Sequence, residues 1–325
     1  MKINETENRI MNYCDNIFDI YPKYNKYLNL NNNISDYILA IYYSNKIPKN
    51  LEYSNYFTNE QSILLAREII GSILPDLVTK YDKYIYENRI KFEDIDYSLT
   101  TNKDGEIESV IRISNTLEQP INILHEFMHC IHLEKFNELS YEEYYYYTEI
   151  MGMIGDIYSV FYLIKNNISK EDSYVYLCDI MNKMAQNADS VLSFGKIMDV
   201  YRTKKGLSKH NISNYIKENN ISPKFINIIK KYNDVKDFRY HEEARYIFAF
   251  PIAFMISLDL ISGNIEKYKL AFNSLPYVKT DVLLHDLILD SHFNDEEQLD
   301  ILMNNIYSDI VGLFEDDKVK KLGVK

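Results

Sequence analysis

The chain has 325 residues, 46% of them hydrophobic, which is long and apolar enough to fold around a large core. Its formal net charge of −12 argues against a nucleic-acid partner and against binding to an anionic membrane surface. The three cysteines have no repeated spacing, so we expect no disulfide framework. Residues 1–25 show no signal-peptide pattern, and no apolar run is long enough to span a bilayer. We therefore expect a cytoplasmic protein without a membrane partner.

Residues 1–95 are predicted to be mostly helical. Apolar side chains recur at helical spacing over Asn4–Ile20, Ser35–Ser44 and Glu60–Ile73, and a tyrosine-rich helix is expected over Leu77–Asn88. Because no motif with catalytic chemistry occurs here, we interpret this part as a helical wall that packs beside or over a site.

Two short segments, 96–101 and 106–114, differ from the helices before them, because the second is rich in β-branched residues. A polar turn containing Asp104-Gly105 joins them, so we predict a hairpin or a small sheet. A strand at the edge of a cleft can bind an extended peptide as an additional strand. The hairpin can equally be scaffold, and the sequence leaves both interpretations open.

The segment Pro120–Asn137 is predicted to form a helix. Thr116 and Gln119 are spaced as a capping box, and Pro120 falls in the first turn, where a missing N–H costs little. One face carries an apolar stripe at helical spacing, formed by Leu124, Met128 and Ile131.

This helix carries the pattern His-Glu-x-x-His at His125, Glu126 and His129. Two histidines four residues apart on a helix point the same way and can share one metal ion. Glu126 would lie beside the open side of that ion, where it can take a proton from water and pass it on. The alternative is a solvated helix face that happens to carry histidines.

A second helix is expected over Tyr141–Lys165, antiparallel to the first after a tight turn, because Ser140 and Glu143 are spaced as a capping box. A catalytic zinc ion takes three protein ligands and leaves a fourth position to water. Glu149 is the best candidate for the third ligand, since it lies 20 residues after the second histidine on the returning helix. Glu142 and Glu143 are rivals in the first turn.

Two later residues of the same helix, Gly152 and Asp156, also fit a metal site. Asp156 could hydrogen-bond one of the histidine rings from behind, as carboxylates commonly do at zinc sites. Gly152 lies inside the helix, where glycine costs about 0.5–1 kcal/mol relative to alanine and is expected where another backbone comes near. A surface carboxylate on an amphipathic helix is the alternative for both acidic residues.

The string HEFMHCIH resembles the HExGHxxH motif of the M3 family of gluzincin metallopeptidases, which contains thimet oligopeptidase and oligoendopeptidase F. The third-ligand motif of that family, E-x-x-S-x-x-x-E, matches Glu149, Gly152 and Asp156. The chain departs from the family in having Met128 for the glycine, Gly152 for the serine and Asp156 for the second glutamate. The resemblance covers residues 116–156, and the chain is shorter than typical members.

A weaker resemblance to the same family lies in Tyr240–Ile261, a segment that we expect to form a buried helix. The resemblance implies that His241 and Tyr246, with Tyr240 as a rival, bind substrate and stabilise the oxyanion. The alternative is that His241 caps a helix and Tyr246 belongs to the core. The remaining residues of 166–325 are predicted to form helices and polar loops without a motif.

Together these patterns predict a mainly α, zincin-type metallopeptidase fold with a small β element before the histidine helix. We expect one domain over 1–325, with a helical N-terminal part (1–95) and a metallopeptidase core (96–325). The predicted activity is zinc-dependent hydrolysis of peptide bonds, and the family resemblance implies short or unstructured peptide substrates. The alternatives are a zincin-fold protein that only binds peptides or a partner, and a peptidase dedicated to one substrate.

Overall fold

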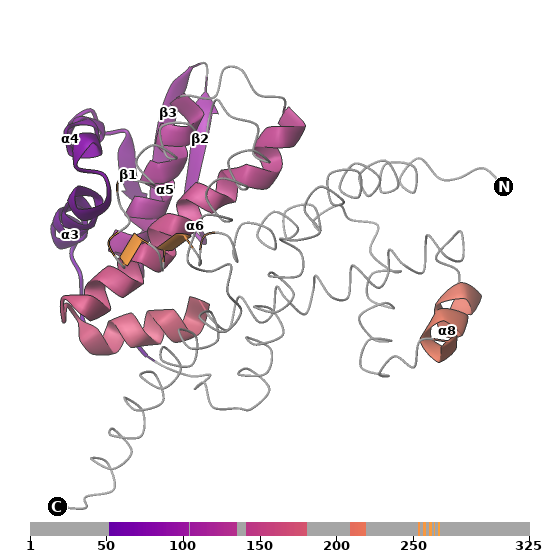
Figure 1. Ribbon diagram of the computed structural model, residues 1–325. Helices are drawn as coiled ribbons and strands as arrows, with labels where there is room; N and C mark the ends of the chain where they lie inside the picture. Colours follow the sequence, from indigo (N-terminus) through magenta and orange to yellow (C-terminus); the bar gives the residue numbers. More distant parts are fainter. Residues whose placement is uncertain are drawn as a thin grey trace, which may run out of the picture. The chain divides into compact units, whose positions relative to one another are not determined.

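A computed structural model describes residues 52–103, 105–134, 141–180 and 209–218, together with isolated positions between 253 and 266 (Figure 1). The chain divides into two compact units, residues 1–40 with 184–247 and residues 41–183 with 248–325. The second unit contains all the described elements except α8 (Lys209–Glu218), which agrees with a helix predicted in this part of the chain. The helices predicted over 4–20 and 35–44 lie outside the described residues, and the single domain stays a prediction.

The first described helix, α3 (Asn59–Ile73), begins at a complete capping box. The Thr58 hydroxyl accepts a hydrogen bond from the Gln61 backbone at 3.2 Å, and the Gln61 side chain accepts one from the Thr58 backbone at 2.9 Å. A short 3₁₀ turn, η2 (Pro75–Leu77), leads into α4 (Val78–Tyr86). Both α-helices agree with the sequence-based prediction.

Three strands form a small sheet in the order β1-β3-β2. β2 (Leu99–Lys103) and β3 (Glu106–Arg112) are the antiparallel pair that the sequence predicts as a hairpin, which is therefore confirmed. The turn between them has Gly105 at φ +88°, a conformation that suits glycine, with its N–H bonded to the Asn102 side chain. β1 (Ile90–Glu93) pairs parallel to β3 and is a strand that the sequence analysis did not predict within the mostly helical residues 1–95.

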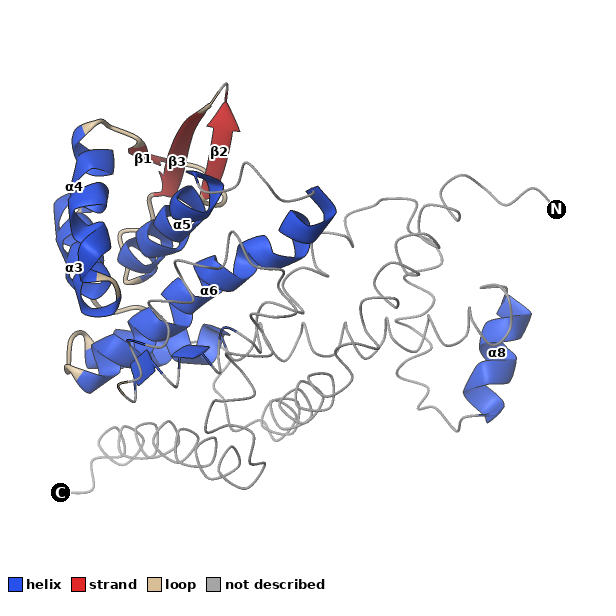
Figure 2. Cartoon of the chain, turned by 45° about the horizontal axis from the view of Figure 1, so that its top comes forward, coloured by secondary structure: helices blue, strands red, loops and turns tan. Residues whose placement is uncertain are grey.

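The central element is α5 (Glu118–Glu134), which packs against α3, β2, β3 and α6 (Tyr141–Lys165) (Figure 2). Its predicted apolar stripe is buried, and on another side Tyr81 and Tyr84 of α4 set their rings edge-on against Phe127, with centroids 5.2 and 5.8 Å away. Helices α3, α4 and α6 and the sheet thus surround α5, and its polar side chains Gln119, Glu126 and His132 are buried.

The start of α5 differs in detail from the predicted capping box. The Gln119 side chain accepts hydrogen bonds from the backbone N–H groups of Ser114 and Asn115, both at 3.2 Å, and not from Thr116. The Thr116 hydroxyl instead accepts from the Glu118 backbone at 3.3 Å. The reason lies in Asn115, whose left-handed φ of +55° turns the chain between β3 and α5 and brings these two amides to Gln119.

A further helix covers residues 170–180, within the range where the sequence predicts one. The buried Asp172 carboxylate on it accepts hydrogen bonds from the backbone N–H groups of Ser54 and Asn55, at 2.8 and 2.9 Å. The predicted fold class, mainly α with a small β element before the histidine helix, is confirmed. Within the part of the chain that the structure describes, no helix is both long and apolar enough to cross a membrane.

Candidate metal centre

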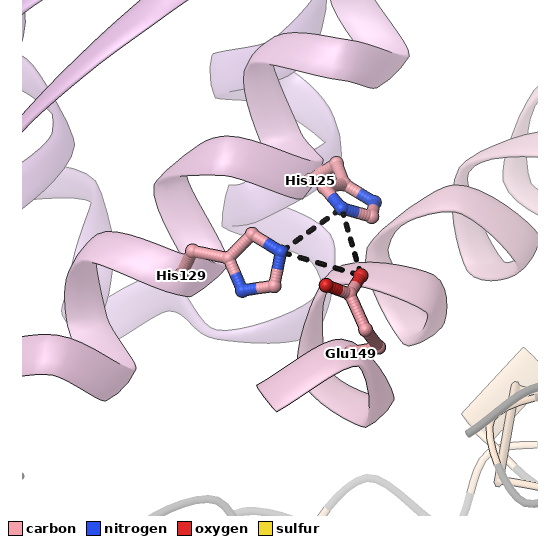
Figure 3. A group of neighbouring side chains, drawn as sticks. All are labelled: His125, His129 and Glu149. Atoms are coloured by element: carbon pink, nitrogen blue, oxygen red, sulfur yellow. Dashed lines mark hydrogen bonds and ion pairs between the residues drawn. The ribbon is translucent and has the colours of Figure 1, made fainter. Parts of the chain in front are cut away.

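Three side chains from two helices converge at the contact between α5 and α6 (Figure 3). His125 and His129 lie one turn apart on α5, and their Nε2 atoms are 3.0 Å from each other. The Oε2 atom of Glu149, on α6, is 3.6 Å from each of these nitrogens. All three side chains are largely buried, with 16%, 14% and 5% of their surface exposed.

These three atoms fit a divalent metal ion. Ligand atoms held about 2.0–2.1 Å from a tetrahedral zinc ion lie about 3.3–3.4 Å from one another. The observed separations of 3.0, 3.6 and 3.6 Å fall on both sides of that value. Two imidazoles and one carboxylate are also the donor set that catalytic zinc takes in many hydrolases. The donor atoms and their spacing therefore suit zinc without rearrangement of either helix.

Asp156, two turns after Glu149 on α6, lies behind the first histidine. Its Oδ2 is 3.0 Å from Nδ1 of His125. A proton on Nδ1 then bonds to the carboxylate, which leaves the lone pair of Nε2 for the side where His129 and Glu149 lie. The other oxygen, Oδ1, is buried and has no hydrogen-bond partner among the described residues.

The pKa values of His125 and Glu149 at this centre are both shifted toward the charged forms. Burial opposes protonation of His125, but Asp156 beside Nδ1 and Glu149 beside Nε2 raise the pKa of the imidazole well above its usual range. Burial by itself would raise the pKa of Glu149, but hydrogen bonds from the two histidines outweigh it and hold the pKa below its usual range. Glu149 is therefore ionised, as a metal ligand must be, and a cation and a proton compete for His125.

Gly152 explains how α6 comes so close to the first histidine. A Cβ atom at this position would lie 2.7 Å from both Cε1 and Nε2 of His125 and 3.0 Å from Cδ2. No ordinary side chain fits there, so the backbone of α6 lies directly against the imidazole ring. A Cβ atom added at Gly155, one turn on, would lie 3.3 Å from Cγ of Leu124, so the approach there is looser. The glycines inside the predicted helix were the signal for this contact.

Glu126 directly follows the first histidine on α5, contacts the sheet and is 95% buried. Its Oε2 accepts a hydrogen bond of 2.6 Å from the hydroxyl of Thr100 on β2. Sequence reasoning missed Thr100. In the sequence, Ser109 is a polar residue at the alternating position between Ile107 and Ile111, and only the structure places it opposite Thr100.

The remaining predicted site residues fall outside this geometry. His241, Tyr246 and the rival Tyr240 lie outside the described residues, so their roles stay predictions. The side chains of Glu142 and Glu143 also lie outside them, and the choice of Glu149 over these rivals rests on its own position.

No protein-family model and no curated protein matches this sequence. Among solved structures, the chain is similar to one described as "Crystal structure of a putative oligoendopeptidase F from Bacillus anthracis str. Ames". The two share 11% sequence identity with a TM-score of 0.49, over 97% of this chain and 56% of that one. This chain therefore spans little more than half the length of that protein.

Proposed function

We propose that this protein is a zinc-dependent peptidase in which His125, His129 and Glu149 hold the metal and Glu126 is the general base. The observation that carries the proposal is the convergence of two imidazole nitrogens and one buried carboxylate oxygen at mutual distances of 3.0–3.6 Å. Asp156 behind the first histidine adds to it, because such a carboxylate fixes the tautomer that a metal ligand needs.

The choice of zinc rests on the donor set and on Glu126. Calcium and magnesium prefer oxygen ligands, which leaves zinc and the transition metals for a site with two imidazoles. Two histidines and one carboxylate also hold iron in some oxygenases. A carboxylate next to the first ligand on the same helix, however, is the arrangement of hydrolases in which that carboxylate acts as a base.

Bound zinc supplies Lewis-acid chemistry, in that it polarises a substrate carbonyl and makes water acidic near neutral pH. The protein side chains do the rest. Glu126 takes a proton from the attacking water on its Oε1 and passes that proton to the nitrogen of the leaving amine. Asp156 keeps the His125 ring in one orientation throughout, by accepting from Nδ1.

Peptides that are short or unstructured are the substrates that we propose, on the strength of the family resemblance of residues 116–156. The weaker resemblance of Tyr240–Ile261 implies that His241 and Tyr246, with Tyr240 as a rival, bind substrate and stabilise the oxyanion. An additional donor of this kind is expected, because the developing oxyanion of a tetrahedral intermediate needs preorganised hydrogen bonds.

The test is hydrolysis of a broad quenched-fluorescent peptide library by the zinc-loaded wild type and by Glu126→Gln, with zinc content measured for both. We expect the variant to retain zinc and to lose about 10²–10⁴-fold in rate. Glu60→Gln, which alters an exposed carboxylate on α3, is the matched control and should cleave like wild type. Full activity of Glu126→Gln would refute the assigned base. No cleavage by the zinc-loaded wild type would leave a protein that only binds peptides.

A further inference from the structure

A chain of three polar side chains leads away from Glu126 into the protein. The Thr100 hydroxyl is 2.6 Å from Oε2 of Glu126 and 3.1 Å from the backbone oxygen of the same residue. Oγ of Ser109 is 2.7 Å from Oγ1 of Thr100, and Sγ of Cys130 is 3.0 Å from Oγ of Ser109. The chain joins β2, β3 and α5, and it ends on the helix that carries Glu126.

The direction of these hydrogen bonds follows from the chemistry of the groups. The hydroxyl of Thr100 carries a single proton, and it is donated to Oε2 of Glu126. The Thr100 oxygen then accepts from the hydroxyl of Ser109, and the Ser109 oxygen accepts from the thiol of Cys130. Each group thus has one place for its proton. The bond of 2.6 Å to Glu126 is in the range of charge-assisted O–H···O⁻ contacts.

The position of Ser109 shows that this chain is built into the fold. The inward face of β3 carries Ile107, Ser109 and Ile111, and all three are buried. A hydroxyl buried on an apolar face is unfavourable unless it is hydrogen-bonded. Ser109 is fully buried and directly opposite Thr100 in the antiparallel register, so both of its partners are supplied by the pairing of β2 with β3 and by α5.

We propose, on the basis of the proposed function, that Thr100 is a positioning residue for the general base. Its hydroxyl holds Oε2 of Glu126, so the carboxylate cannot rotate about its last bond. With Oε2 bound to Thr100, Oε1 is the carboxylate oxygen that remains to accept the proton of the attacking water. Ser109 and Cys130 hold the hydroxyl of Thr100 in turn. Thr100 touches no reacting atom and acts only through Glu126.

The test compares Thr100→Val, which replaces the hydroxyl by a methyl group of similar shape, with Thr100→Ser, which keeps the hydroxyl. We expect Thr100→Val to lose about 10–100-fold in kcat, the order expected when a catalytic group moves by about 1 Å, with KM within twofold and zinc content unchanged. Thr100→Ser should recover most of that rate. Thr101→Val, an exposed neighbour on the same strand, is the matched control and should behave like wild type.

The outcomes separate this inference from the proposed function. Wild-type kcat in Thr100→Val, in an enzyme that Glu126→Gln inactivates, overturns the inference and leaves the function intact. Activity in Glu126→Gln overturns the proposed function instead.

A measurement that does not depend on activity completes the test of the inference. Crystal structures of zinc-loaded wild type and Thr100→Val should show the Glu126 carboxylate turned or spread over several positions in the variant, and an unchanged carboxylate overturns the inference. Should Thr100→Val fail to fold, Thr100→Ala, which also removes the hydroxyl, is subjected to the same measurements and the same criteria.

Discussion

Replacing Gly152 by alanine is expected to weaken zinc binding while the protein still folds. The added Cβ would lie 2.7 Å from Cε1 and Nε2 of His125, about 0.7 Å inside the 3.4 Å at which ordinary contacts begin. The ring cannot simply move away, because Asp156 holds Nδ1 at 3.0 Å and His129 lies 3.0 Å from Nε2. Either the imidazole rotates or α6 moves outward.

Both movements exceed what a zinc site tolerates, since metal–ligand distances vary by only about 0.2 Å. We therefore expect a loss of about 10–100-fold in zinc affinity, the range found when groups that orient a metal-binding histidine are altered. The effect on folding should be small. Overpacking costs about 1–3 kcal/mol, and the higher helix propensity of alanine returns about 0.5–1 kcal/mol of this.

The assay is zinc affinity by competition with a chromophoric chelator, alongside urea denaturation of the metal-free protein. Gly155→Ala and Gly71→Ala are matched controls, because their added Cβ atoms meet a neighbour at 3.3 and 3.5 Å and not a histidine ring. Both should bind zinc within about threefold of wild type, well short of the effect on a ligand ring. Wild-type zinc affinity in Gly152→Ala would refute the reasoning, because it would mean that His125 is not a ligand in the observed orientation.

Three further predictions concern neighbouring groups. Asp156→Asn should lower zinc affinity by about 10–100-fold, as measured by the same competition assay, because the amide no longer favours the Nδ1–H tautomer of His125. The metal-free protein should lose stability as the pH falls below about 4.5, the ordinary pKa of a glutamate, because the pKa of Glu149 is lower in the folded state. Thermal unfolding of Glu149→Gln should therefore depend less on pH in that window. Asp172→Ala should destabilise the protein by about 2–4 kcal/mol in urea denaturation, because two backbone N–H groups lose their acceptor.

Each of these has a result that contradicts it. For Asp156→Asn, this is unchanged zinc affinity. Equal acid sensitivity of wild type and Glu149→Gln would show that this carboxylate is not stabilised by the histidines. The control for Asp172 is Glu171→Ala, an exposed neighbour on the same helix, and equal stability of the two variants would contradict the assigned hydrogen bonds.

Local sequence patterns were sufficient to predict α5 and the arrangement on it. His125, Glu126 and His129 take their relative positions from the period of the helix, and the apolar stripe determines which face is buried. The place of Glu149 required more, namely that two helices pack side by side. Internal glycines and an expected tight turn indicated this packing, but the distances in the centre come only from the structure, and metal binding itself stays a prediction.

The elements that sequence reasoning missed depend on contacts between distant residues. β1 is four residues long, and its pairing of Ile90 with Ser109 joins segments that local patterns cannot relate. Thr100 on its own is an ordinary strand residue. Its hydrogen bond to Glu126 arises only when β2, β3 and α5 have assembled, so no local pattern could predict it.

The contact between α5 and α6 has a consequence for how the protein is assembled. If all three ligands hold one ion, the metal links two helices whose nearest ligands, His129 and Glu149, are only 20 residues apart. So short a loop loses little chain entropy on closure, and most of the stabilisation then comes from the metal–ligand bonds themselves. The midpoint of thermal unfolding becomes a function of free zinc concentration, and the cell's supply of metal helps to set how much of this protein is folded.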